Sequence, residues 1–207
     1  MKHLDHLVYA SPDLQTGIDQ IETLLGIRAV FRGRHLKFGT HNALLALGPK
    51  CYLEIVSPDP TQTDFQGPLL FSLDTITEPR LVTWVARTGQ VEDLAARPLD
   101  RGLRLGEVGS GSRQTPEGAT LSWKATSPYT VIADGVVPFL IDWEQSPHPA
   151  GSAPTGAQLI DLWAEHPEAA HVQTILEQLD LELTVSEGVQ PALVATIDCP
   201  LGRVELR

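Results

Sequence analysis

The order of expected strands and helices repeats three times along the chain, and this repeat constrains the fold more than any other feature. Each copy is predicted as a strand, a helix and three further strands from hydrophobic alternation, helical spacing and turn residues. Leu4 and Leu159 also precede the helix-opening prolines, Pro12 and Pro167, by the same interval. An internal repeat of this kind indicates similar units packed together. We therefore expect an α+β fold of repeated βαβββ modules, with curved mixed sheets forming a cleft and helices packed outside.

The expected modules cover residues 1–60, 80–145 and 156–207, and the third is the shortest. Stretches rich in glycine, serine and proline at 109–112 and 116–118 predict loops, and the stretch at 146–156 predicts a linker. Within that linker, His148 lies between two prolines and is interpreted as a turn residue. The expected strands are 3–9, 29–31, 42–47, 52–57, 81–87, 105–108, 119–125, 136–143, 158–165, 182–187, 193–197 and 203–206.

The first helix carries clear signals at both ends. Ser11 is the expected N-cap, Pro12 suits the first turn, and Asp13 complements the helix dipole. Gly26 is the expected stop. Between these ends, one apolar stripe recurs at helical spacing, formed by Leu14, Ile18, Ile21 and Leu25.

Composition narrows the class of protein. The chain has 207 residues, of which 42% are hydrophobic and 20% charged, and a formal net charge of −11. The acidic balance argues against nucleic acid and anionic membranes as partners. No apolar run is long enough to span a bilayer, and the first residues lack the apolar core of a signal peptide. Cys51 and Cys199 fit no metal-finger spacing, so we expect free thiols in the cytoplasm.

A histidine and a glutamate lie within expected strands, where an apolar residue would be less costly to bury. Because side chains alternate along a strand, His6 is expected to share a face with Leu4 and Val8. Asp5 is expected on the opposite face. If the two strands are neighbours, His6 and Glu54 offer an imidazole and a carboxylate to a divalent metal. The alternatives are a histidine held by structural hydrogen bonds and a glutamate facing water.

Three motifs carry a family resemblance: LDHLVYA at 4–10 followed by PDL, GTHNALL at 39–45, and YLEI at 52–55. Weaker matches follow at Trp84, at 112–113, at Trp123 and at 138–143. Together they resemble the vicinal oxygen chelate superfamily, which includes glyoxalase I, extradiol dioxygenases and fosfomycin- and bleomycin-resistance proteins. More narrowly, the chain resembles glyoxalase-like domain proteins over nearly its whole length.

The resemblance implies positions for metal ligands, because the first and last strands of a module supply them in that superfamily. These positions are His6 and Glu54 in the first module. In the second module the first-strand position falls on Trp84, which cannot ligate. The last strand offers Asp142, although the spacing favours Phe139 or Ile141 at the ligand position. Two protein ligands would bind an octahedral ion weakly, because such an ion takes about six donors.

Other residues are candidates for holding a substrate. His35 and His41 flank a loop-like polar segment, which is also readily explained as a plain surface loop. Arg113 follows a flexible stretch and suits an anionic group, although a surface hairpin explains it as well. The tryptophans could line an apolar pocket or simply fill the core. Asp161 and Glu205 are interpreted as third-module echoes of the ligand positions. The candidate substrate-binding residues are His41, Asn42, Trp84, Arg113, Trp123 and Asp142.

Two functions remain open from the sequence. One is a lyase- or isomerase-type enzyme in which Ni, Zn, Mn or Fe, held by His6 and Glu54, binds adjacent oxygens of a small substrate. Glu54, if released from the metal, would serve as a base. A dioxygenase-related reaction ranks lower, because such an iron site wants two histidines and a carboxylate. The other is a metal-free binding or resistance protein with an aromatic cleft. A homodimer formed through open sheet edges is a further expectation.

Overall fold

The computed structural model describes residues 3–115, 118 and 120–207. Pro116, Glu117 and Ala119, which fall in an expected loop and at the start of an expected strand, lie outside the described residues. The helices are α1 (Leu14–Leu25), α2 (Val91–Ala96) and α3 (Ala169–Gln178). The strands are β1 (Leu4–Ala10), β2 (Val30–His35), β3 (Thr40–Gly48), β4 (Cys51–Pro58), β5 (Arg80–Arg87), β6 (Val108–Gln114), β7 (Thr120–Thr126), β8 (Phe139–Asp142), β9 (Gln158–His166), β10 (Thr184–Glu187), β11 (Ala192–Cys199) and β12 (Gly202–Leu206).

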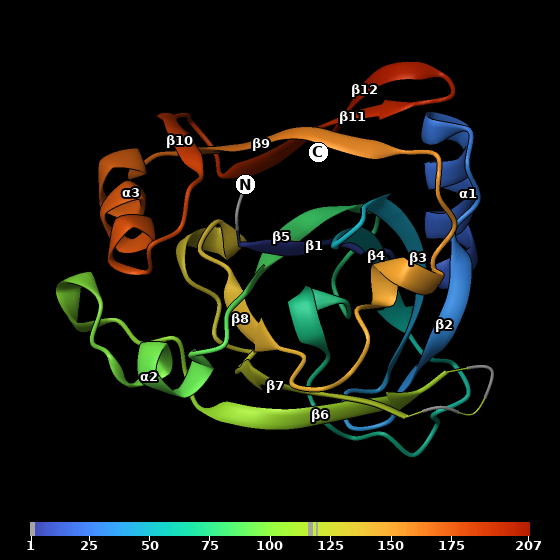
Figure 1. Cartoon of the computed structure of the whole chain (residues 1–207), viewed down its shortest axis with the longest axis horizontal. Helices are drawn as coiled ribbons and strands as arrows, with labels where there is room; N and C mark the ends of the chain where they lie inside the picture. The colour runs from blue at the N-terminus through green and yellow to red at the C-terminus, as the bar shows by residue number, and fades with distance from the viewer. Residues whose placement is uncertain (1–2, 116–117, 119) are drawn as a thin grey trace.

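An eight-stranded sheet curls almost into a barrel, and the expected α+β class with curved mixed sheets is confirmed (Figure 1). Its strand order is β2-β3-β4-β1-β5-β8-β7-β6, with β1 and β5 antiparallel at the centre. β1 runs parallel to β4, and β5 runs parallel to β8. The edge strands β2 and β6 approach each other, and Arg113 donates from Nη1 to the carbonyl oxygen of Arg32 at 2.5 Å. The curvature therefore encloses a concave interior.

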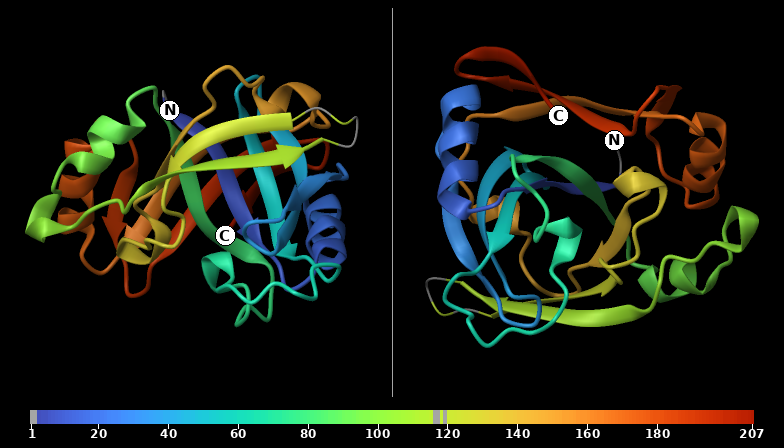
Figure 2. Two further views of the ribbon diagram at one scale, coloured as in Figure 1. Left: turned by 90° about the horizontal axis from the view of Figure 1, so that it is seen from below. Right: turned by 180° about the vertical axis from the view of Figure 1, so that it is seen from behind.

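A second sheet, in the order β10-β9-β11-β12, lies against the convex side of the large sheet (Figure 2). The helix α1 packs on the same side, on β3 and β4, and reaches β12. One apolar core fills this convex side, and a separate one fills the concave side. The strands of residues 1–60 and 80–145 thus share one sheet, whereas those of 156–207 form the other; their division into modules stays an interpretation.

The ends of α1 correct one detail of the sequence prediction. Asp13, not Ser11, is the N-cap, and its carboxylate accepts the backbone N–H of Thr16 at 2.9 Å. Ser11 is buried instead and donates from its hydroxyl to the carbonyl oxygen of Asp13. Gly26 ends the helix as predicted, because its φ of 71° is a left-handed conformation that glycine adopts without a steric penalty.

A bulge in β1 changes which side chains face the cavity. Leu4 pairs with Ala86 and His6 with Val85, so Asp5 is an extra residue opposite β5. Strict alternation is therefore broken, and Leu4 joins the convex core whereas His6 faces the concave side. The expectation that Leu4 and His6 share a face was wrong for this reason.

The strand predicted at 105–108 was also misplaced. The glycine- and serine-rich stretch 109–112, expected to be a loop, lies inside β6 and pairs with β7. Gly111 lies in this strand beside Trp123, and a Cβ atom at Gly111 would come within 2.4 Å of the indole. Glycine is thus required there for close approach of a ring, and not for a turn.

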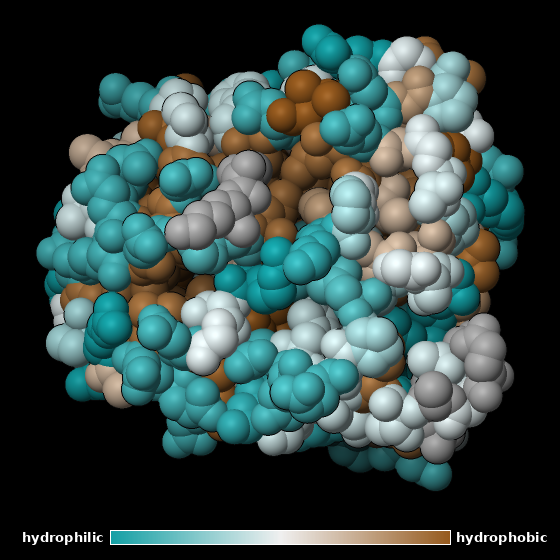
Figure 3. Space-filling model, viewed as in Figure 1, coloured by the Kyte–Doolittle hydropathy of each residue, from teal (hydrophilic) through white to brown (hydrophobic). Residues whose placement is uncertain are grey.

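The described surface is mostly hydrophilic on the face seen in Figure 3, where apolar side chains are visible mainly in the recesses between the layers. No helix in the described ranges is both long and apolar enough to cross a membrane.

Candidate functional site

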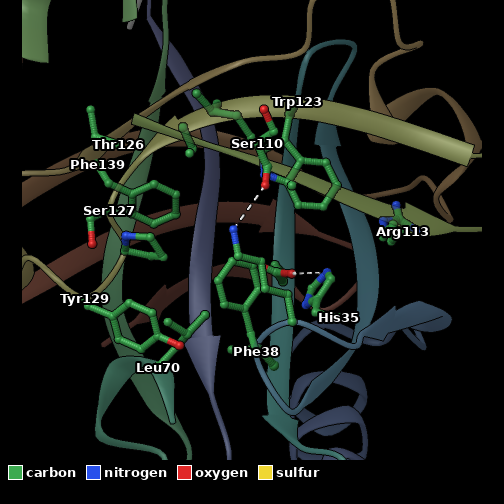
Figure 4. A pocket seen from close by; sticks show the side chains of 18 of the residues that line it. His35, Phe38, Leu70, Ser110, Arg113, Trp123, Thr126, Ser127, Tyr129 and Phe139 are labelled. Carbon is green, nitrogen blue, oxygen red and sulfur yellow. Dashed lines mark hydrogen bonds and ion pairs between the residues drawn. The ribbon is translucent and has the colours of Figure 1, made fainter. Parts of the chain in front are cut away.

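The concave side of the large sheet holds a cavity of about 250 Å³. Polar side chains of this cavity come from β1, β2, β3, β4 and β6, and its aromatic side chains come mainly from β7, β8 and the connecting loops. Figure 4 shows part of this lining. This volume suits a ligand smaller than a typical drug. The cavity lining includes His6, His35, Asn42, Glu54, Trp123 and Phe139.

His6 is held by its neighbour in the chain. Nδ1 of His6 lies 2.8 Å from Oδ1 of Asp5. Because an ionised carboxylate only accepts hydrogen bonds, Nδ1 carries a proton and donates a hydrogen bond to Asp5. In the neutral ring Nε2 then keeps its lone pair, and it lies 3.7 Å from Oε2 of Glu54. Tyr52 stacks on the imidazole, with ring centroids 4.4 Å apart, and so fixes the ring plane.

Asp5 is fully buried and collects four donors. Besides His6, it accepts from the indole N–H of Trp143 at 3.1 Å and from Nη1 of Arg87 at 3.2 Å. Nε2 of His148 lies 3.1 Å from Oδ2. Burial alone would raise the pKa of Asp5, but the hydrogen bonds from His148 and His6 outweigh it and hold the pKa well below the usual range. Asp5 therefore stays ionised and fixes His6.

Neither Asp5 nor His148 was predicted to belong to the site. Alternation placed Asp5 on the wrong face, and the bulge that reverses this leaves no clear mark in the sequence. His148 was interpreted as a turn residue in a linker. It also caps the short helical turn Pro149–Ser152, but its ring reaches back to a carboxylate 143 residues earlier in the chain.

Glu54 faces the cavity from β4, as strand alternation predicts. The amide Nδ2 of Asn42 donates to its Oε1 at 2.6 Å. This bond sets the orientation of both groups, because a carboxylate cannot donate to the amide oxygen. Glu54 is 9% exposed, so the cavity contains a carboxylate that is largely removed from water.

His35 completes the polar side of the cavity. Its Nε2 lies 3.4 Å from Nδ2 of Asn42 and 4.0 Å from Oε1 of Glu54, while Nδ1 lies 3.1 Å from the hydroxyl of Thr40. Burial lowers the pKa of His35; Glu54 opposes this shift, and Arg113 and His6 add to it. A neutral His35 can accept from Asn42 at Nε2 and donate to Thr40 at Nδ1. His35 can therefore hold the amide of Asn42, and through it the carboxylate of Glu54, in position.

The second half of the large sheet does not supply matching metal ligands. Val85 pairs with His6 on the concave side, so the first-strand position is Val85 and not Trp84. The last-strand position falls on Ile141, which lines the cavity. Neither side chain has a nitrogen, oxygen or sulfur atom that could bind a metal. No group of three or more His, Cys, Asp or Glu in the described part of the chain could hold a metal ion. The residues present do not fit the centre that the resemblance implies.

The remaining candidates divide between the cavity and other places. Arg113, Asn42 and Trp123 line the cavity. Trp84 is buried in the convex core and donates its indole N–H to the carbonyl oxygen of Val136 at 2.8 Å. Asp142 is half-buried outside the cavity lining and accepts the backbone N–H of Glu144.

His41 is one residue from Asn42 but faces away from the cavity lining. It contacts the ring of Phe31 edge-on, with centroids 6.4 Å apart. Asp161 and Glu205 are exposed on the second sheet. The structure therefore brings together half of the predicted substrate-binding residues with His6 and Glu54.

Comparison with known proteins points to one family. A family profile described as a glyoxalase-like domain matches residues 4–179. A hypothetical protein from Staphylococcus aureus has a similar structure, with a TM-score of 0.60 and 15% identity over 98% of this chain and 83% of that one. Methylmalonyl-CoA epimerase from Mycobacterium tuberculosis is 22% identical over 72% of this chain and 92% of that one, with a TM-score of 0.43. No curated protein matches the sequence.

Proposed function

The chain belongs to the glyoxalase-like domain family of the vicinal oxygen chelate superfamily, and from that premise we propose that it is an enzyme that moves a proton on a small molecule in its cavity. His6 is the base. The reaction is of lyase or isomerase type, in which a carbon next to a carbonyl group loses a proton. The observation that carries this proposal is the Asp5–His6 hydrogen bond of 2.8 Å, which occupies Nδ1 and leaves Nε2 for the cavity.

The two carboxylates beside His6 support this role. When Nε2 accepts a proton, the ring becomes an imidazolium with Asp5 at one nitrogen and Glu54 3.7 Å from the other. Both carboxylates stabilise the positive charge that forms, and Asp5 also keeps the ring oriented. A positioned general base of this kind contributes about 10²- to 10⁴-fold to a rate.

Metal dependence, predicted from the resemblance, is not part of this proposal. The positions that would complete a centre with His6 and Glu54 are Val85 and Ile141, and neither side chain can ligate. A metal-free binding protein is the second candidate. The aromatic wall formed by Trp123 and Phe139 favours it, because such a wall can hold a small molecule without reacting with it.

Deuterium exchange tests the proton transfer even though the natural substrate has not been identified. Small carbonyl compounds with aromatic or alkyl bodies are incubated with the protein in D₂O, and proton NMR follows the signal of the carbon next to the carbonyl group. We expect exchange with some members of the panel, and a His6→Gln variant to be at least about 100-fold slower. His171→Gln is the matched control. His171 is also a histidine paired with an aspartate, with its Nδ1 2.8 Å from Oδ2 of Asp100, but it lies outside the cavity lining.

The outcomes separate the candidates. Equal exchange in His6→Gln and the wild type contradicts the assignment of the base. Binding without exchange, across the panel, favours the binding protein. Exchange that a chelator abolishes and a divalent metal restores favours the metal-dependent reaction. The expected homodimer remains a proposal that light scattering tests.

A further inference from the structure

Glu54 is a buried charge whose nearby partners are histidines. In the described residues, its ion-pair contacts within 4.0 Å are with His6 at 3.7 Å and His35 at 4.0 Å. Nε2 of His35 lies 3.4 Å from Nδ2 of Asn42, where the neutral ring accepts a hydrogen bond and brings no charge to Glu54. A carboxylate removed from water is stabilised by a counter-charge, and a bound cation would provide one.

The polar atoms around this carboxylate are mainly hydrogen-bond acceptors. Oε1 of Glu54 is taken by Asn42, which leaves Oε2 toward His6. Nε2 of the neutral His6 ring is also an acceptor, because Nδ1 donates to Asp5. A ligand that brings N–H donors would satisfy this side of the cavity, whereas an anionic group would be repelled.

Aromatic side chains form the opposite wall. The ring of Trp123 lies 5.3 Å from that of Trp143 and 6.2 Å from that of His35, measured between centroids. Phe139 approaches His6 edge-on at 6.4 Å. Figure 4 shows Trp123, Phe139 and Tyr129 around the space in front of His35. Aromatic faces attract organic cations and also bury the apolar body to which an ammonium group is attached.

We propose that the substrate is a small organic amine, bound with its ammonium group on Oε2 of Glu54 and its apolar body against Trp123 and Phe139. The proposal rests on the proposed function, since it names the substrate class of the same cavity. Nε2 of His6 then faces the proton next to the carbonyl group, two or three bonds from the nitrogen. The net charge of −11 also favours the approach of a cation.

Two cationic side chains line the same cavity and define the competing ligand class. Nζ of Lys37 lies 3.4 Å from the carbonyl oxygen of Ser110, and Arg113 donates to the carbonyl oxygen of Arg32. Both contacts join β2 or its following turn to β6, at the seam where the sheet edges meet. They are therefore assigned to closing the barrel, and a carboxylate ligand would have to compete with them.

The test compares benzylamine, benzyl alcohol and benzoate, which share a ring and differ in charge. Dissociation constants are measured at pH 7.5 by calorimetry and by tryptophan fluorescence. We expect benzylamine to bind at least 10-fold more tightly than benzyl alcohol, and benzoate to bind most weakly. Glu54→Gln should remove the preference for the amine. Glu205→Gln, which changes the net charge equally at an exposed position on β12, should preserve it.

Equal or tighter binding of benzyl alcohol or benzoate by the wild type overturns the proposal, and this comparison does not depend on the folding of a variant. A preference that survives Glu54→Gln, or no binding by any probe, also overturns it. The His6→Gln variant separates this inference from the proposed function. Suppose that His6→Gln keeps the preference for benzylamine while neither the wild type nor any variant exchanges deuterium. The amine site then stands and the proton-transfer function fails.

Discussion

Asp5 and His6 are adjacent in the chain, yet their side chains meet, with Oδ1 of Asp5 2.8 Å from Nδ1 of His6. Adjacent residues in a regular strand face opposite sides of the sheet. The bulge at Asp5 allows the contact, because the extra residue between the pairs Leu4–Ala86 and His6–Val85 turns its carboxylate toward the concave side. A local irregularity thus creates the pair to which the proposed chemistry is assigned.

Replacing Asp5 by Asn should be strongly destabilising. The change removes a buried negative charge from among Arg87, His148 and Trp143 and leaves donors unpaired. Breaking a buried charged network in this way costs about 3–5 kcal/mol. Urea denaturation measures the loss. Asp198→Asn, at an exposed ion pair with Arg203, should change the free energy of unfolding far less. Equal effects would show that Asp5 contributes no more than a surface charge.

Asp5 and Trp143 should be energetically coupled. Trp143→Phe keeps an aromatic ring but loses the indole N–H that lies 3.1 Å from Oδ2 of Asp5. A hydrogen bond to a charged group contributes about 1.5–3 kcal/mol. In a double-mutant cycle with Asp5→Asn, the combined loss should be smaller than the sum of the single losses. Additive losses would place the stabilising role of Trp143 in ring packing alone.

A methyl group at Gly111 should disturb the aromatic wall. A Cβ atom there would lie 2.4 Å from the ring of Trp123, so the ring must move. Overpacking of this kind costs about 1–3 kcal/mol. Gly111→Ala should therefore weaken benzylamine and benzyl alcohol binding alike and shift the tryptophan emission.

Gly109→Ala is the matched control, because the nearest atom to its Cβ, Nζ of Lys37, lies 4.0 Å away on a flexible side chain. Loss of binding in Gly109→Ala to the same extent would contradict the role assigned to the ring of Trp123.

Stability should fall as the pH falls, through two groups. The lowered pKa of Asp5 contributes stability that is complete above its unfolded value of about 4 and is lost below it. The lowered pKa of His35 means that the unfolded chain binds the extra proton first, so stability also falls below about pH 6.5. Thermal unfolding between pH 3 and pH 8 measures both steps.

Variants separate the two contributions. His35→Gln should flatten the stability curve between about pH 6.5 and pH 5. Asp5→Asn should flatten it below about pH 4. A curve for His35→Gln that parallels the wild type would show that His35 does not titrate on unfolding.

Part of the candidate site could be predicted from the sequence. Alternation in 52–57 correctly directs Glu54 to one face with Tyr52 and Val56, and all three line the cavity. His6 could be found because a histidine within an apolar strand is costly unless it has partners. The place of Trp84 could not be predicted, since a tryptophan on a buried sheet is equally suited to the convex core and to the cavity.

The sequence by itself determined the first helix and the alternation of the strand around Glu54, because helical spacing, Gly26 and strand periodicity act over a few residues. It also determined the α+β class, through the repeated order of elements. Tertiary structure alone decided which polar groups meet. His148 reaches Asp5 across 143 residues only when the sheet curls, and Val85 faces His6 only through the pairing of β5 with β1. Such contacts depend on the register and curvature of distant strands, which no local pattern specifies.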